Sequence, residues 1–261
     1  MIFNWLRKKR REKITNQKFP THWEEIIESK MRYFHILPKS MKKHLLNTVQ
    51  IFLAEKHIEG CGGFEITDEV RVTIAVQACI LLLNRDAKIY PKLKTILVYE
   101  TAFFAEQEEH TEDGLISMSN ETRAGESWDL GVVVLAWEEV LVGLRHKHDG
   151  YNVIIHEFAH QLDQEDSETD GVPTLDHRSH YPRWQEVFSE HYRQLLKDVR
   201  RNRKTVLDDY GATNPAEFFA VATESFFEES IKLKKKHPDL YAVLSQYYKQ
   251  DPAQYWVDAR T

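Results

Sequence analysis

The sequence predicts an α+β fold that is mostly helical, with a small mixed sheet beside one apolar helix. Apolar residues recur at the spacing of an amphipathic helix through much of the chain. Two short runs rich in β-branched residues, 95–99 and 132–135, have the composition of strands. The apolar stretch 151–162 contains His-Glu-x-x-His, which places two histidines on one face of a helix.

Composition indicates a folded protein. The 261 residues fit one large domain or two small ones, and 42% hydrophobic residues exclude general disorder. The net charge of -6 argues against a nucleic-acid partner bound through a basic surface. Cys61 and Cys79 are too few for a disulfide framework, and no apolar run is long enough for a membrane span or signal peptide. We therefore expect a cytoplasmic location.

The N-terminus differs in charge from the rest of the chain. Its basic residues are Arg7, Lys8, Lys9, Arg10, Arg11, Lys13 and Lys18, against one acid, Glu12. Such a segment could be a solvated tail, an amphipathic helix on an anionic membrane, or a nucleic-acid arm. We favour the tail, and so expect residues 1–20 to be flexible and residues 21–261 to form a single domain. Within that domain, residues 21–150 would form a helical and sheet part and residues 151–261 the helices of the candidate site.

Helices dominate the first part of the predicted domain. Thr21 and Glu24 have the spacing of a capping box at the start of the first helix. A second helix is expected over residues 40–55, and a third from Thr67 or Asp68 to about residue 83. Glycines at positions 60, 62 and 63 predict a turn between the second and third helices.

Strands and helices alternate after Pro91. Between the two β-branched runs, residues 106–113 are acidic and predict a mobile loop, and residues 115–118 predict a further strand. A turn is expected at residues 146–150. The remaining helices are predicted at residues 137–144, 151–162, 183–200, 215–229 and 239–248.

The helix at 151–162 carries the clearest chemistry. His156 and His160 are four residues apart, so both imidazoles can bind one Zn²⁺, and Glu157 can reach a water on that metal. The surrounding residues are apolar, so this helix should be mostly buried and its polar side chains need partners. The alternative is a core helix whose histidines bind backbone carbonyls.

A catalytic zinc takes three protein ligands and one water, so one more ligand is required. Asp166, six residues after His160, has the spacing of a third ligand close to the histidine pair. That arrangement needs a glycine at position 163, where the chain must turn sharply out of the helix, and Asp163 stands there instead. Three further histidines are expected on solvated surfaces, at positions 177, 180 and 191.

Glu217 is the strongest candidate for the third ligand, and it has a second interpretation. Asn214 as N-cap, Pro215 at the first helical position and Glu217 at the third form a good helix start that explains the glutamate without a metal. The residues alone do not separate the two interpretations. Glu224, seven residues later on the same face, is an alternative ligand or a hydrogen-bond acceptor for a ligand histidine.

Together, His156-Glu157-x-x-His160 and the segment 214–220 resemble the Mlc titration factor A family of zinc metallopeptidases. The segment 210–220 is also similar to the zinc site of the anthrax lethal factor catalytic domain. The family resemblance covers most of the chain after residue 21. It implies a zincin-like fold of the gluzincin type and one zinc per chain, on His156, His160 and Glu217.

The resemblance also implies roles for two further residues: Glu157 as the general base and Tyr210 as a hydrogen-bond donor in the transition state. Gly211 is expected to let the chain fold the phenol back over the zinc. The pattern departs from thermolysin-like enzymes at Val221, where an acid is expected. The hydrogen-bond partner of the ligand histidines is therefore open between Glu224 and Asp163.

The expected reaction is hydrolysis of a peptide or protein substrate by zinc-activated water. The strand at 132–135 would be either an edge that pairs with the substrate or a buried central strand. A different class of function is a regulatory protein that sequesters a transcription repressor governing sugar uptake, a partner that the resemblance implies. A third possible function is that of a zinc hydrolase that cleaves a bond other than a peptide bond.

Overall fold

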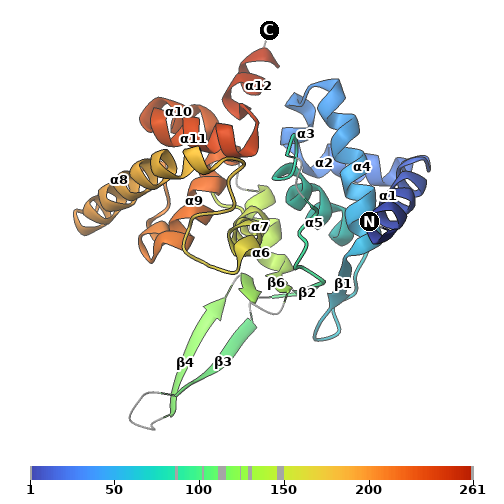
Figure 1. Cartoon of the computed structure of the whole chain (residues 1–261). Coiled ribbons are helices and arrows are strands. Elements are labelled where there is room, and N and C mark those ends of the chain that lie inside the picture. Colours follow the sequence, from blue (N-terminus) through green and yellow to red (C-terminus); the bar gives the residue numbers. More distant parts are fainter. Residues whose placement is uncertain are drawn as a thin grey trace.

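The computed structural model describes residues 2–85, 88–101, 103–110, 116–123, 125–128, 131–145 and 150–259. Figure 1 shows a mainly helical molecule with strands at one end, as the α+β prediction requires. The helices are α1 (Ile2–Thr15), α2 (Thr21–Lys30), α3 (Arg32–Ile36), α4 (Lys39–Glu55), α5 (Asp68–Ile80), α6 (Trp137–Arg145), α7 (Val153–Asp163), α8 (Tyr181–Arg200), α9 (Pro215–Glu228), α10 (Ser230–Lys236), α11 (Pro238–Tyr248) and α12 (Pro252–Asp258). Three short 3-10 helices are η1 (Gln164–Asp166), η2 (Arg178–His180) and η3 (Asp209–Ala212). The strands are β1 (His57–Gly60), β2 (Thr95–Tyr99), β3 (Phe103–His110), β4 (Ile116–Arg123), β5 (Gly125–Trp128) and β6 (Val132–Ala136).

Four strands form a mixed sheet in the order β1-β2-β6-β5. The β1–β2 and β2–β6 pairs are parallel, and β5 is antiparallel to β6. Ile96 lies opposite Val133 and Val98 opposite Leu135, and all four side chains are fully buried. The mixed sheet is thus confirmed. Of the two interpretations of residues 132–135 the central strand is correct, because β6 lies between β2 and β5.

Two local predictions were wrong in part. The glycine-rich turn at residue 60 follows an additional strand, β1, and a Cβ on Gly60 would collide with the carbonyl oxygen of Phe64. Residues 106–110 belong to β3, which pairs with β4, and not to a loop. Residues 116–118 lie in β4 as expected. Residues 111–113, 115 and 146–149 are outside the described residues.

The helix starts follow local chain geometry. Pro20, extended at φ -63° and ψ 128°, occupies the cap position of α2, so Thr21 is already helical and the predicted capping box does not form. Thr67, by contrast, caps α5, because its side chain accepts a hydrogen bond from the Val70 N–H. The predicted helices at 40–55, 137–144, 183–200, 215–229 and 239–248 correspond to α4, α6, α8, α9 and α11.

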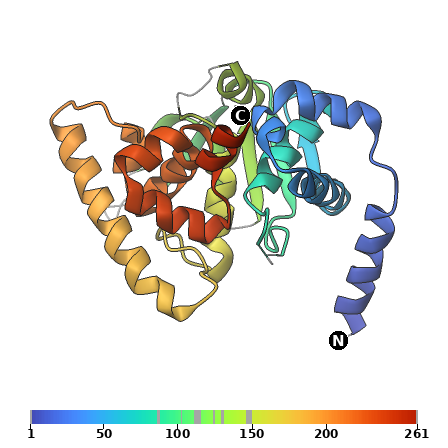
Figure 2. The same ribbon diagram turned by 90° about the horizontal axis from the view of Figure 1, so that it is seen from above.

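The basic N-terminal segment is helical. Helix α1 packs against α4, and the Arg11 guanidinium donates two hydrogen bonds to the Glu55 carboxylate at 2.8 and 2.6 Å. Figure 2 shows α1 at the periphery, with the N-terminus farthest from the other helices. That residues 21–261 form a single domain stays a prediction.

Helix α7 lies at the centre of the molecule. It contacts β5 and β6 of the sheet, α5 on the N-terminal side and α9 on the C-terminal side. Ile154, Phe158 and Leu162 on this helix are fully buried. The Phe158 ring meets the ring of Tyr90 with centroids 4.8 Å apart and that of Phe52 at 5.8 Å. This apolar packing holds one side of α7 against the N-terminal part of the protein and so leaves its histidines facing α9.

Candidate metal centre

Two helices bring the candidate ligands together. His156 and His160 lie one turn apart on α7, and their Nε2 atoms are 3.2 Å from each other. Glu217 is in the first turn of α9, and its Oε2 lies 2.9 Å from His156 Nε2 and 3.3 Å from His160 Nε2. Little of these side chains reaches solvent, with exposed fractions of 12%, 9% and 16%. The structure thus assembles the three predicted ligands.

The start of α9 bears on both interpretations of Glu217. Asn214 is the N-cap, and its side-chain oxygen accepts a hydrogen bond from the Glu217 N–H at 3.0 Å. Pro215 occupies the first helical position. The cap is therefore supplied by Asn214, while the Glu217 carboxylate is directed to the two histidines and carries out no capping of its own in the described contacts.

The donor set fits a catalytic zinc ion. One ligand atom from each of His156, His160 and Glu217 can be chosen so that all lie within 4.8 Å of one another, and no other such trio is found among the described residues. Two imidazole nitrogens and one carboxylate oxygen are the three protein ligands of one common type of catalytic zinc site. The three groups lie close enough together to bind one metal ion in common.

Glu224 settles the partner of His156. Its Oε1 lies 2.7 Å from His156 Nδ1, which leaves Nε2 directed to the ligand cluster. The other carboxylate oxygen accepts a hydrogen bond from the backbone N–H of Asn152. Burial is the largest single influence on the pKa of His156 and acts to lower it, but the Glu224, Glu217 and Glu157 carboxylates together outweigh burial and raise this pKa well above its usual value.

Asp163, the other candidate partner, has a different contact. Its Oδ2 accepts a hydrogen bond from the Gly171 N–H at 2.9 Å, and its Oδ1 is buried without a partner. Burial raises the pKa of Asp163 to about 6, although the Gly171 N–H opposes the shift. Gly171 has φ +78°, and a Cβ there would collide with the carbonyl oxygen of Pro215. Asp163 therefore holds this loop against the first turn of α9.

Glu157 follows the first histidine of the cluster and is buried. Only 5% of it is exposed, and its Oε2 has no hydrogen-bond partner. Burial raises the pKa of Glu157 to about 7, against the influence of the two neighbouring histidines. The pKa of Glu217 shifts in the opposite direction: burial acts to raise it, but hydrogen bonds with His156 and His160 lower it to about 2. The site thus contains two carboxylates in contrasting environments.

Tyr210 lies at the solvent side of the cluster. It is 56% exposed, and its ring centroid is 5.8 Å from that of His156. The backbone there is held in η3 by Asp208, which accepts a hydrogen bond from the Tyr210 N–H at 2.8 Å. The expectation for Gly211 was wrong, because this residue is buried and serves close packing. A Cβ on it would lie 3.2 Å from both Leu195 Cδ2 and Val221 Cβ.

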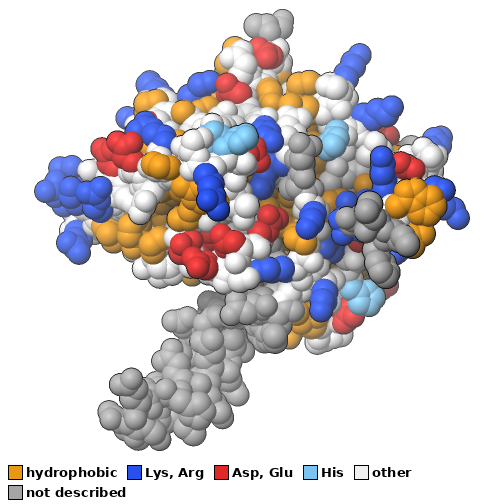
Figure 3. Space-filling view, viewed as in Figure 1, with side chains coloured by type: hydrophobic (Ala, Val, Ile, Leu, Met, Phe, Trp, Pro, Cys, Tyr) orange, Lys and Arg blue, Asp and Glu red, His pale blue; other side chains and the backbone are white. Residues whose placement is uncertain are grey.

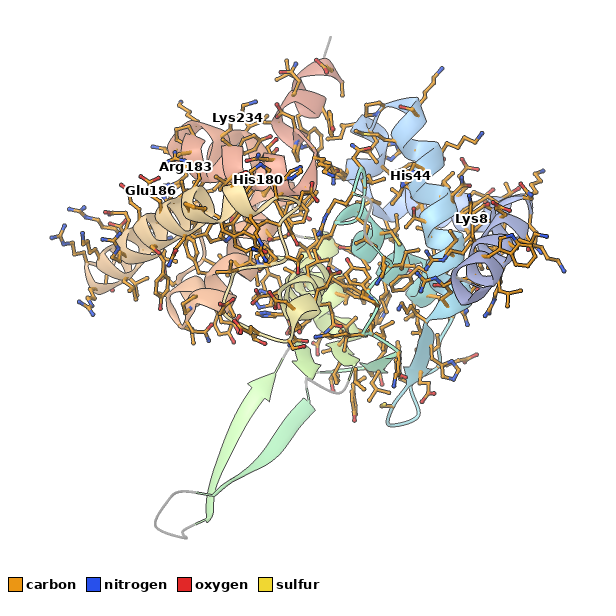
Figure 4. The ribbon with its side chains drawn as sticks, viewed as in Figure 1. Lys8, His44, His180, Arg183, Glu186 and Lys234 are labelled. Carbon is orange, nitrogen blue, oxygen red and sulfur yellow. The ribbon has the colours of Figure 1, made fainter. Side chains whose placement is uncertain are left out.

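The remaining candidates lie outside the cluster. Asp166 is exposed and accepts a hydrogen bond from the Glu168 N–H. His180, labelled in Figure 4, has its Nε2 3.1 Å from Nε2 of Gln246. His191 pairs with Asp239 at 2.8 Å, and because its side chain is only 12% exposed the expectation of a solvated position was wrong for this residue. The ring of His177 packs against that of His180 with centroids 5.4 Å apart.

Sequence reasoning missed one residue that organises the site. Asn152 caps α7 by accepting a hydrogen bond from the Ile155 N–H at 3.1 Å. Its side-chain amide donates to Gln77 of α5 at 2.6 Å and to Glu228 of α9 at 2.9 Å. The available signal was an asparagine directly before the apolar helix, which is a typical N-cap position.

Comparisons with known proteins agree on one family. The model of the glucose-regulated metallopeptidase M90 family matches residues 3–249. An uncharacterized protein of Synechocystis sp. is 43% identical over 93% of this chain and 89% of its own length. Mlc titration factor A of Pectobacterium atrosepticum is 30% identical over 88% of this chain and 86% of its own length. That of Escherichia fergusonii is 28% identical, with the same coverage of both chains.

A search of the described helices for membrane spans finds none with the length and apolar character needed to cross a bilayer.

Replacing Asn152 by Ala should destabilise the protein more than replacing Thr67 by Ala. Both residues cap a helix, which is worth about 1 kcal/mol. Loss of the Asn152 amide also leaves Gln77 and Glu228 without this donor, so we expect a total decrease of about 2–4 kcal/mol in the free energy of unfolding. Urea denaturation of the two variants measures the difference. Equal losses would show that the amide contacts add nothing.

Proposed function

Because the chain belongs to the glucose-regulated metallopeptidase M90 family, we propose that it is a zinc-dependent peptidase that hydrolyses peptide bonds. The observation that carries the proposal is the cluster of His156, His160 and Glu217 beside a buried glutamate, Glu157, with one unpartnered oxygen. A purely structural zinc site is closed by four protein ligands and needs no base next to it. This combination favours catalysis over a structural role.

His156 and His160 would hold one zinc ion per chain through Nε2, together with the Glu217 carboxylate. Bound there, zinc would polarise a substrate carbonyl and lower the pKa of a water molecule. Glu224 orients the His156 ring through Nδ1, and so keeps Nε2 directed to the cluster. Asp163 acts less directly, since it positions the loop that contacts the start of α9.

Glu157 is the group that we assign to proton transfer. Its carboxylate would accept a proton from the attacking water as the new C–O bond forms. The same proton would pass to the nitrogen of the leaving amine as the C–N bond breaks, which regenerates the carboxylate. The free Oε2 supports this role, because no protein hydrogen bond must be broken before it can accept the proton.

Tyr210 and the sheet would act on the substrate. The Tyr210 ring lies beside His156, at the exposed side of the cluster, from which its hydroxyl could donate to the oxyanion. Strand β5 is an end strand of the four-stranded sheet, and it contacts α7. We propose that an extended peptide pairs with this strand through backbone hydrogen bonds.

A second function is supported by the names of the relatives. Several that match this chain over most of its length are named Mlc titration factor A. We propose that this chain also binds a transcription repressor, in the cytoplasm, with hydrolysis secondary in that role.

Peptide-library cleavage before and after chelation, together with metal analysis of the purified protein, distinguishes the peptidase function from the repressor-binding function. Zinc without any cleavage would favour the binding role, and cleavage of a non-peptide bond would point to another hydrolase.

Replacing Glu217 by Gln should abolish most of the metal affinity while the fold stays intact. The amide is a far weaker zinc ligand than the carboxylate, whereas the Asn214 cap uses only the backbone N–H of this residue. Zinc content after dialysis against a mild chelator is the measurement, with the exposed Glu186→Gln as control. A full equivalent of zinc in the Glu217 variant would place the third ligand elsewhere.

Replacing Glu157 by Gln should preserve zinc binding but reduce hydrolysis by roughly a thousandfold or more, because the proton acceptor is lost. Turnover of a cleaved library peptide, with zinc quantified in the same samples, tests this. Comparable turnover in the two zinc-loaded proteins would refute the role of Glu157.

Replacing Tyr210 by Phe should lower turnover by about 10-fold to 1000-fold with little change in KM and none in zinc content. A hydroxyl directed to the oxyanion stabilises the transition state more than the bound substrate. Steady-state kinetics distinguishes the alternatives: a higher KM at constant turnover would assign the hydroxyl to substrate binding.

A further inference from the structure

Helix α1 has one face against the protein and one face that is exposed to solvent in residues 5–13. On the inner side, Arg11 pairs with Glu55, and Arg10 donates to the carbonyl oxygen of Ala54 at 3.4 Å. Among residues 5–15 of this helix, Arg11, Ile14 and Thr15 are partly buried and the others are exposed. The helix is therefore held at its C-terminal half, while the N-terminal half extends along the periphery (Figure 2).

The outer face combines large apolar side chains with lysines. Trp5 is 54% exposed and Leu6 51%, which makes them two of the five large hydrophobic residues exposed in the described part of the chain. The Lys9 ammonium lies 4.0 Å above the Trp5 ring. At about 100° per residue, Trp5, Lys9, Lys13 and Leu6 fall within one arc of about 100°, opposite Arg11. This arc is defined here as the outer face of α1.

Charge on this helix is opposite to that of the rest of the protein. Residues 1–18 hold seven Lys or Arg and one Glu, whereas the whole chain has a net charge of -6. Figure 3 shows basic side chains around an apolar patch over α1, and Lys8 is labelled on this helix in Figure 4. Exposed charges more than about 10 Å from an anionic surface are largely screened from it at 0.1 M salt. A surface next to α1 would therefore interact mainly with the basic residues of this helix and little with the acidic residues elsewhere on the protein.

We propose that the outer face of α1 binds the surface of an anionic phospholipid bilayer. Trp5 and Leu6 would enter the boundary between headgroups and acyl chains, and the lysines would contact lipid phosphates. The face is accessible without any movement of α1 away from α4. Nucleic acid fits less well, because phosphate contacts do not require two adjacent exposed apolar side chains. This binding is independent of the metal centre and would place the whole protein at a membrane surface.

The test is co-sedimentation of the full chain with vesicles. Vesicles of equal parts phosphatidylcholine and phosphatidylglycerol should bind the protein at least 10-fold more tightly than pure phosphatidylcholine vesicles. Added salt should weaken this binding, since part of it is electrostatic.

Two variants separate the apolar and the basic contributions. The double variant Trp5→Ala with Leu6→Ser should reduce binding about 10-fold or more. The triple variant Lys8→Gln, Lys9→Gln and Lys13→Gln changes the two lysines of the outer face and the exposed Lys8 next to that face, and should reduce binding on the order of 100-fold. A control at the end of α8, Arg200→Gln with Arg201→Gln and Lys204→Gln, removes the same charge from another exposed basic run and should change binding less than twofold. All affected side chains are exposed, so circular dichroism should be unchanged.

Two outcomes would overturn the proposal. The first is no binding to the anionic vesicles; in that case a gel shift of duplex DNA that the triple variant abolishes would assign the face to nucleic acid, and a dimer that the Trp5 and Leu6 variant dissociates would assign it to a second copy of the chain. The second is an equal loss of vesicle binding in the α8 control.

Discussion

The contact between α7 and α9 is the constraint on which the site depends. His156 lies between Glu217 at one ring nitrogen and Glu224 at the other, and all three side chains are largely removed from solvent. Buried charges are tolerated only where they are paired and hydrogen-bonded, so neither helix can shift along the other without leaving a carboxylate unpaired. The same pairing that stabilises the contact also directs three ligand atoms to one point.

Two further contacts fix the ends of these helices. Asn152 caps α7 and connects it to α5 and α9 through its amide, while its own N–H is bonded to Glu224. Asp163, at the other end of α7, holds Gly171 against the first turn of α9. The histidines therefore lie on a helix restrained at both ends, which is the arrangement that a preorganised site requires.

Local patterns predicted the parts of the fold that local chemistry decides. The His-Glu-x-x-His helix, β2, β6 and the capped start of α9 at Asn214 follow from residues close in sequence. What was missed depends on distant residues. Strand β1 forms because Ile58 pairs with Ile96, and the preference of His156 for Glu224 over Asp163 depends on how α9 crosses α7. The failed capping box at Thr21 is a local exception, caused by the extended Pro20 before it.

The apolar core and the polar site lie on opposite sides of α7, so the residues that stabilise this helix are different from the residues of the candidate site. Phe158 packs between Phe52 and Tyr90 on the N-terminal side, whereas His156 and His160 face α9. Helix α1 reaches this centre only through α4 and α5, which lie between it and α7. A surface bound by α1 would therefore restrain the orientation of the whole protein without changing the ligand geometry. The proposed membrane attachment would therefore be independent of the proposed metal binding.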